Sequence, residues 1–159
     1  MKFRLLLFVV LLTTSQLVSA QEIKTYNFHE LEPLLHHQND TTYVLNFWAM
    51  WCKPCVEELP YFEAIHKNSK QKKVKVILVS LDFGKNVQER LNKFRTKKKI
   101  SAEIVLLDAP DADSWINKVD KNWDGALPAT VVYKKNIKEV FTRQVTYQEL
   151  AETIDKMNQ

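Results

Sequence analysis

Short apolar runs alternate along this chain with segments in which apolar residues recur every three or four positions. Runs rich in β-branched and aromatic residues predict buried strands, and they lie at residues 43–48, 74–81, 103–107, 130–133 and 139–142. The helical spacing predicts helices, at residues 53–69, 85–97, 111–122 and 146–157. Strands that alternate with helices are typical of an α/β fold with parallel crossovers. The last two strands, joined by a turn at residues 134–136, predict an antiparallel edge and therefore a mixed sheet.

Polar residues and prolines at fixed offsets mark where several of these helices begin. Pro54 stands in the first turn of the 53–69 helix, where its missing N–H costs nothing. Asp111 is a candidate N-cap for the 111–122 helix. Thr146, followed three residues later by Glu149, has the pattern of a capping box. These signals support the helix starts that the apolar spacing predicts.

The first twenty residues have the layout of a secretory signal peptide. Two basic residues come first, residues 5–12 form an unbroken apolar run, and small residues lead up to Ala20. Cleavage after Ala20 is therefore expected, with an uncleaved membrane anchor as the alternative. The apolar run is shorter than the roughly 20 residues that a membrane span needs. Residues 21–159 contain no internal repeat and no Gly- or Pro-rich linker, so we expect them to form a single domain.

Composition narrows the possible partners and ligands. The formal charge of +4 gives no indication of a nucleic-acid partner. Lysine runs at residues 72–73 and 97–99 are interpreted as solvated ends of elements. The four histidines lie far along the sequence from the two cysteines, which therefore lack the further ligands that a zinc site needs. We expect no metal and no bound cofactor.

The two cysteines, Cys52 and Cys55, are the only ones in the chain and stand three positions apart. An exported protein meets an oxidising compartment, where disulfides persist. A stapling disulfide gains most from closing a long loop, and this pair would close almost none. The spacing therefore favours a redox pair that cycles between dithiol and disulfide.

The predicted position of the pair, between the end of a strand and the start of a helix, suggests a division of labour. Cys52 would face unpaired backbone N–H groups and the positive end of the helix dipole, which together lower a thiol pKa. Its thiolate would attack a substrate disulfide. Cys55, one turn further on, would resolve the mixed disulfide. Glu58, three residues after Cys55 and partly buried, could accept its proton, whereas Glu57 is expected to be solvated.

The motif that surrounds the cysteines resembles the thioredoxin superfamily. The sequence from Phe47 to Cys55 reads FWAMWCKPC, and Pro60 follows five residues after the second cysteine. The stretch CKPCVEELP is similar to the TlpA/ResA-like branch of exported bacterial thiol–disulfide oxidoreductases. That branch has a glutamate at the position of Glu58, and an asparagine, here Asn46, where cytosolic thioredoxins have a buried aspartate. The resemblance implies a three-layer thioredoxin-like fold, with a mixed central sheet, flanking helices and a TlpA-type helix–strand insert.

A second motif, LPATVVY at residues 127–133, resembles the cis-proline loop of the same superfamily. The resemblance implies that Pro128 follows a cis peptide bond and packs opposite the cysteines. The backbone of Leu127 would then pair with an extended substrate, as an added strand does. We expect Trp51 and Pro54 to contact the substrate as well, and Trp48 to belong to the core.

These observations predict an exported, periplasmic thiol–disulfide oxidoreductase that reduces disulfides in exported partner proteins through Cys52 and Cys55. The resemblance implies a membrane thiol electron donor that re-reduces the pair, and it suggests roles in cytochrome c maturation or in repair of misoxidised proteins. We expect a monomer. One alternative is an oxidant of the same fold that donates its disulfide. Another is a copper-binding module, because soft thiolates suit Cu(I).

Overall fold

The computed structural model describes residues 22–69 and 73–159. The predicted signal peptide, residues 1–20, lies outside this range. The strands of the described part are β1 (Lys24–Tyr26), β2 (Thr42–Trp48), β3 (Val74–Ser80), β4 (Glu103–Leu107), β5 (Ala129–Lys134) and β6 (Ile137–Phe141). The helices are α1 (Phe28–Leu31), η1 (Glu32–Leu35), α2 (Lys53–Asn68), α3 (Val87–Lys98), η3 (Ala112–Ser114), α4 (Ile116–Val119) and α5 (Tyr147–Met157).

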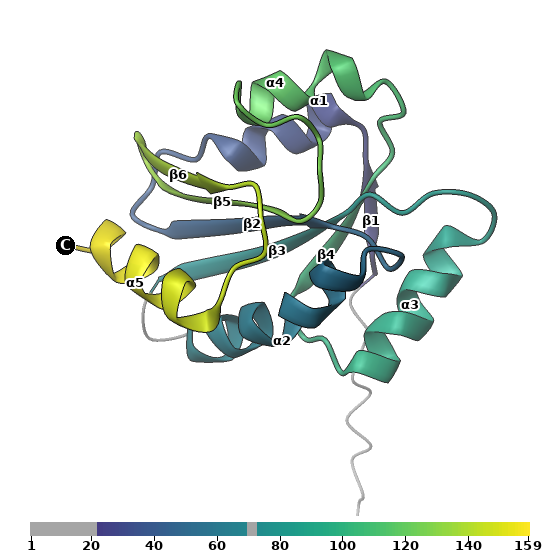
Figure 1. Cartoon of the computed structure of the whole chain (residues 1–159), viewed down its shortest axis with the longest axis horizontal. Coiled ribbons are helices and arrows are strands. Elements are labelled where there is room, and N and C mark those ends of the chain that lie inside the picture. Colours follow the sequence, from purple (N-terminus) through teal and green to yellow (C-terminus); the bar gives the residue numbers. More distant parts are fainter. Residues whose placement is uncertain (1–21, 70–72) are drawn as a thin grey trace, which may run out of the picture.

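The strands form one six-stranded sheet in the order β1-β4-β3-β2-β5-β6 (Figure 1). The pairs β1–β4, β4–β3 and β3–β2 are parallel, whereas β2–β5 and β5–β6 are antiparallel. The mixed sheet with an antiparallel edge is therefore confirmed. Strand β2 lies between a parallel and an antiparallel neighbour, so the loop that follows it is flanked by both.

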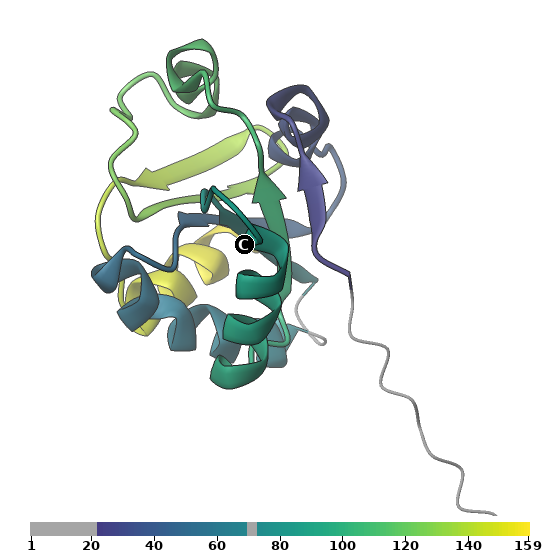
Figure 2. The ribbon, with the colours of Figure 1, turned by 90° about the vertical axis from the view of Figure 1, so that its right-hand side faces the viewer.

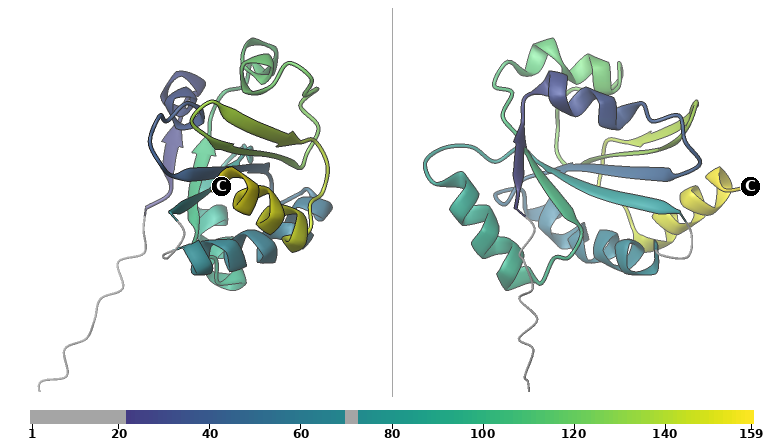
Figure 3. Two further views of the ribbon diagram at one scale, coloured as in Figure 1. Left: turned by 90° about the vertical axis from the view of Figure 1, so that its left-hand side faces the viewer. Right: turned by 180° about the vertical axis from the view of Figure 1, so that it is seen from behind.

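Helices cover both faces of the sheet and make three layers, as the fold prediction required. Helices α2, α3 and α5 lie on one face, and α1, η1 and α4 lie on the other (Figures 1 and 2). The views from the left and from behind agree with this arrangement (Figure 3). Each face has its own apolar core, which we call the α2-side core and the α1-side core. None of the helices in the described residues is long and apolar enough to cross a bilayer.

Strand β2 supplies side chains to both cores because successive residues of a strand point to opposite faces. Val44 and Trp48 belong to the α2-side core, and Leu45 and Phe47 belong to the α1-side core. Trp48 is fully buried, so its prediction as a core residue is confirmed. Asn46 has the same parity as Val44 and Trp48, and it is a polar residue buried beneath α2.

The prediction of one helix over residues 111–122 was wrong. The segment forms the short helices η3 and α4, and the chain leaves helical geometry between them at Trp115, with φ −131°. Asp111 does occupy the N-cap position of η3, but its side chain makes no capping hydrogen bond. The Trp115 ring is buried and stacks on Phe28 at 5.5 Å between centroids. Tertiary packing of this indole therefore overrides the helical spacing in the sequence.

The other elements fall close to the predicted boundaries. The capping box at the start of α5 is present, with Thr146 and Glu149 each accepting a hydrogen bond from the other's backbone N–H. The predicted turn between β5 and β6 also forms, with Lys135 in the left-handed region at φ 53°. Strand β1 was not predicted. The helix–strand insert specific to the TlpA-like branch stays a prediction.

Candidate active site

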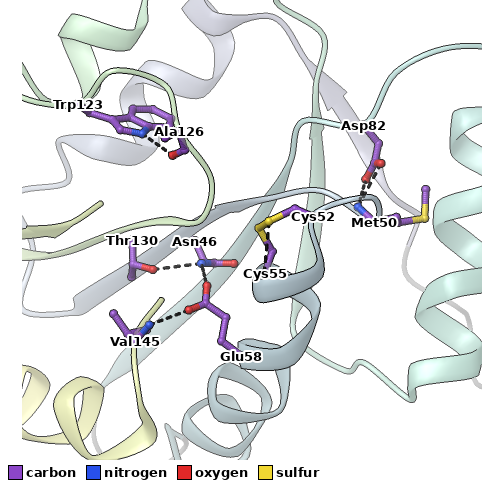
Figure 4. The surroundings of a disulfide bond; sticks show 10 residues. All are labelled: Asn46, Met50, Cys52, Cys55, Glu58, Asp82, Trp123, Ala126, Thr130 and Val145. Carbon is purple, nitrogen blue, oxygen red and sulfur yellow. Dashed lines mark hydrogen bonds between the residues drawn. A yellow bond between two sulfur atoms is a disulfide. The ribbon is translucent and has the colours of Figure 1, made fainter. Parts of the chain in front are cut away.

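Cys52 and Cys55 form a disulfide at the start of α2, where the chain has just left β2 (Figure 4). Cys52 is the N-cap residue of α2, and its Sγ accepts a hydrogen bond from the Cys55 N–H at 3.3 Å. Cys52 retains 6% of its exposure, whereas Cys55 retains none. The helix end would therefore stabilise a thiolate on Cys52 after reduction, and of the two residues only Cys52 has a small exposed area.

The loop that carries Cys52 is held by a buried aspartate from the neighbouring strand. Asp82 follows β3, and its two carboxylate oxygens accept the Met50 N–H at 3.1 and 3.0 Å (Figure 4). Ser80 supports this carboxylate, because its hydroxyl donates to Asp82 at 2.8 Å. Asp82 was not among the predicted site residues. The available signal was an aspartate directly after the apolar run at residues 74–81, which was predicted as a strand.

Glu58 lies beneath the disulfide and is fully buried, not partly buried as predicted. Its Oε1 accepts the Asn46 Nδ2–H at 2.8 Å, and its Oε2 accepts the Val145 N–H at 2.9 Å. Burial raises the pKa of Glu58 to about 7 because desolvation disfavours the carboxylate, and these two hydrogen bonds only partly oppose the effect. At neutral pH both the acid and the carboxylate are therefore populated.

Glu58 and Cys55 stand three positions apart on one face of α2, and the pKa of Glu58 suits proton transfer near neutral pH. Glu57, by contrast, is exposed, and its carboxylate lies 3.9 Å from the Lys53 ammonium on the outer side of the helix. The structure thus separates two adjacent glutamates into a buried group near the sulfurs and a solvated one, and the solvated position of Glu57 is the one that was predicted.

The peptide bond between Leu127 and Pro128 is cis. Ala129, the next residue, pairs with Phe47 of β2, so Leu127 and Pro128 continue this antiparallel register beside the start of the cysteine loop. Pro128 is buried and Leu127 is half-buried. The preceding loop is closed on itself by the indole N–H of Trp123, which donates to the Ala126 carbonyl at 2.8 Å (Figure 4).

Two large apolar side chains on the loops at this end of the sheet are open to solvent. Trp51, adjacent to Cys52, is 64% exposed, and Phe83, adjacent to Asp82, is 76% exposed. Pro54 in the first turn of α2 is exposed as well. Phe83 was missed by sequence analysis, since a phenylalanine between a strand and a helix gives no signal of its exposure. Exposed aromatic residues beside a reactive group provide a surface for an apolar partner.

A metal site receives no support from the part of the chain that the structure describes, where no three His, Cys, Asp or Glu side chains gather closely enough to hold an ion. The chemistry that this site can perform is that of its disulfide, its buried acid and its cis-proline loop.

Fold and site together define a thioredoxin-like domain, with a Cys-x-x-Cys disulfide at a helix start and a cis-proline ahead of the antiparallel strand. The sequence model of the AhpC/TSA family matches residues 18–140, and the chain belongs to this family.

Similarity to individual proteins agrees with this assignment. The chain is 28% identical over 115 residues to the thiol-disulfide oxidoreductase ResA of Geobacillus kaustophilus, which is 71% of this chain and 61% of that protein. It therefore spans about three fifths of that relative.

Solved structures of two Corynebacterium proteins share the fold. A DsbF homologue from Corynebacterium diphtheriae superimposes with a TM-score of 0.61 and 26% identity, over 74% of this chain and 73% of that one. A secreted thiol-disulfide isomerase from Corynebacterium glutamicum has a TM-score of 0.62 and 20% identity, over 76% of this chain and 72% of that one.

Proposed function

We propose that this protein is an exported thiol–disulfide oxidoreductase that reduces disulfides in partner proteins. The observation that carries the proposal is the position of the two cysteines: Cys52 caps a helix and is slightly exposed, whereas Cys55 is fully buried above Glu58. Such an arrangement separates an attacking sulfur from a resolving one. The names of the similar proteins, ResA and a DsbF homologue among them, support the same class of reaction.

The proposed cycle begins with the reduced dithiol. The Cys52 thiolate attacks one sulfur of a substrate disulfide, a bond forms between Cys52 and that sulfur, and the second substrate sulfur leaves as a thiolate that takes a proton from water. Cys55 then loses its proton to Glu58 and attacks Cys52. The Cys52–Cys55 disulfide forms, the first substrate sulfur is released as a thiolate, and two electrons have passed to the substrate.

Residues around the sulfurs would hold the substrate. Leu127, on the cis-proline loop, presents its backbone beside the cysteine loop, where an extended segment could pair as an added strand. Pro128 fixes that loop, and Trp51 and Pro54 provide an exposed apolar surface next to Cys52. This surface suits an unfolded or extended segment in which apolar side chains flank the disulfide.

The location and the partners belong to the same proposal. Residues 1–20 would direct export to the periplasm and residues 21–159 would form the working domain, a monomer. The secreted relative from Corynebacterium glutamicum supports the location. A membrane thiol electron donor must return electrons to the disulfide, because an oxidising compartment does not supply them. Cytochrome c maturation is one use of such reducing power.

The proposal is tested by trapping substrates. In Cys55→Ser the mixed disulfide on Cys52 cannot be resolved, so exported proteins should be recovered covalently attached to this variant and released by a reductant. Cys52→Ser is the matched control, and it should capture none. Recovery of equal amounts on both variants, or of nothing on either, would contradict the proposed reaction.

The reduction potential tests the direction of electron flow. A value below about −200 mV supports the reductase, whereas a value near −120 mV supports an oxidant of the same fold. The measurement requires only equilibration of the purified protein with glutathione buffers of known ratio.

A further inference from the structure

The side chain of Asn46 has an unusual hydrogen-bond balance. It is fully buried, and its Nδ2 donates both to Glu58 at 2.8 Å and to the Thr130 hydroxyl at 3.0 Å. Its Oδ1 is also buried and has no hydrogen-bond partner among the residues that the structure describes. A buried carbonyl oxygen without a donor costs free energy, so its presence calls for an explanation.

The orphan oxygen faces the resolving cysteine. Figure 4 shows Oδ1 of Asn46 directed toward Cys55, on the side of the amide opposite Thr130. The fold dictates this placement, because Asn46 lies on the α2 side of β2 while Cys55 and Glu58 lie on one face of α2. In the disulfide form the Cys55 sulfur carries no proton, so it cannot donate a hydrogen bond to Oδ1 of Asn46.

Reduction changes that balance. The reduced Cys55 thiol carries an S–H group, and the nearby buried Oδ1 is an acceptor for it. A hydrogen bond between them would satisfy an atom that is unpaired in the disulfide form.

Transfer of the Cys55 proton to Glu58 also changes the hydrogen bonds that the Asn46 amide can make. Both oxygens of Glu58 already accept hydrogen bonds, from Asn46 and from Val145. A protonated Glu58 therefore needs an acceptor, and the Asn46 amide supplies one if it turns by half a revolution. Oδ1 then accepts from the Glu58 hydroxyl, and Nδ2 faces the Cys55 thiolate. The Thr130 hydroxyl can donate as well as accept, so it keeps its bond in either orientation.

We propose that Asn46 is a positioning residue for the resolving step. Its Oδ1 accepts a hydrogen bond from the Cys55 thiol, and after the thiol proton moves to Glu58 the turned amide donates its Nδ2–H to the Cys55 thiolate. The inference rests on the proposed function, since it assigns a role within the second exchange. No covalent bond to Asn46 forms or breaks, and one proton passes from sulfur to carboxylate. The raised pKa of Glu58 is consistent with its acting as the acceptor.

Two substitutions separate the two halves of this role. Asn46→Leu removes both the acceptor and the donor at nearly constant volume. Asn46→Asp keeps an oxygen toward Cys55 and an acceptor toward a protonated Glu58, but it has no N–H for the thiolate. Thr130→Val is the matched control, because it removes a hydrogen bond from the same amide while leaving Oδ1 and Nδ2 in place.

The first readout is the S–H stretching frequency of Cys55 in a Cys52→Ser background, where it is the only thiol. Hydrogen bonding should lower this frequency when Asn46 is native, in Asn46→Asp and in the Thr130→Val control, and the frequency should rise to that of a free thiol in Asn46→Leu. An unchanged frequency in Asn46→Leu would overturn the acceptor role, and a rise of the same size in Thr130→Val would show that general repacking is responsible.

The second readout is the rate at which Cys55 resolves a mixed disulfide of Cys52 with a small chromogenic thiol. Loss of a hydrogen bond to a thiolate should slow this step about tenfold in both Asn46→Asp and Asn46→Leu. Resolution by Asn46→Asp at the native rate would overturn the donor role. The stretching frequency needs no protein substrate, so it decides the contact at Asn46 even if trapping on Cys55→Ser contradicts the proposed function.

Discussion

Two glutamates five residues apart on α2 show how burial and hydrogen bonding decide the charge of a side chain. Glu58 meets two donors in a fully buried site, and desolvation there raises its pKa to about 7. Glu63 is also buried, which opposes ionisation, but donors from Ser101 and Ala102 outweigh that effect and lower its pKa. The same residue type thus becomes a proton acceptor in one place and a fixed anion in the other.

Replacement of Glu58 by glutamine should stabilise the oxidised protein in alkaline solution. The folded pKa of about 7 exceeds the ordinary 4.5, so the native state binds more protons than the unfolded chain between these values. Wild-type stability therefore falls as pH rises through this window. Glu58→Gln should gain roughly 2 kcal/mol in free energy of unfolding at pH 8, measured by urea denaturation.

Below pH 4.5, the ordinary value for a glutamate, this advantage should vanish because both states are then protonated. Glu57→Gln is the matched control on the exposed side of the same helix, and it should change stability little at any pH. A Glu58→Gln protein no more stable than wild type at alkaline pH would contradict the account of its burial.

Glu63→Gln should have the opposite sign. Its carboxylate accepts the backbone N–H of Ser101 at 3.0 Å and that of Ala102 at 3.1 Å, which ties α2 to the chain entering β4. Because its folded pKa is lowered, the stabilisation is present above the ordinary pKa and is lost as pH falls through the folded value. We expect a loss of about 1–3 kcal/mol at neutral pH, shrinking in acid. A loss that stays constant down to strong acid would indicate packing instead of charge.

At the scale of residues, sequence found the groups that do chemistry more readily than the groups that hold them. The spacing of Cys52, Cys55 and Glu58 is local, so the pattern of one helix reveals it. The donor from Val145 comes from 87 residues further along the chain, and no local signal connects the two. Asp82 was missed for the same reason, since its role depends on which strand lies beside β2.

At the scale of elements, the turn between β2 and α2 depends on a support from β3. Asp82→Asn should weaken this support. Both carboxylate oxygens of Asp82 accept the Met50 N–H, whereas an asparagine amide has only one oxygen. We expect a loss of about 1–3 kcal/mol and faster hydrogen exchange at Met50. Asp108→Asn is the control, since Asp108 is exposed and directly follows the adjacent strand β4. Equal rates of amide hydrogen exchange at Met50 in the two variants would contradict a role of Asp82 in holding this turn.

The elements that sequence predicted well are those whose burial pattern is long and regular. Strands β2 and β3 are seven residues each, and most of their side chains are buried, so the apolar runs were unambiguous. Strand β1 has three residues with none fully buried, and it forms only because β4 offers an edge. Residues 111–122 have helical spacing but do not form one helix. The apolar residues at this spacing, Trp115 and Val119, pack instead into the α1-side core.

At the scale of the whole molecule, one sheet separates two cores and belongs to both. A disturbance on either face must therefore strain the strands that the other face packs on. We expect the chain from residue 21 to 159 to unfold in a single transition, with coincident curves from far-ultraviolet circular dichroism and from aromatic signals. Two separated transitions would show that the faces fold independently.

The positions of the four tryptophans give this sheet a last consequence. Trp115 and Trp123 are buried in the α1-side core, whereas Trp48 lies beneath α2 and Trp51 stands exposed one residue before Cys52. A disulfide close to an excited indole quenches its fluorescence, and a dithiol quenches it far less. The tryptophan fluorescence of the protein should therefore increase when the disulfide is reduced. The fluorescence of an unlabelled sample would then report the redox state of the cysteine pair in real time.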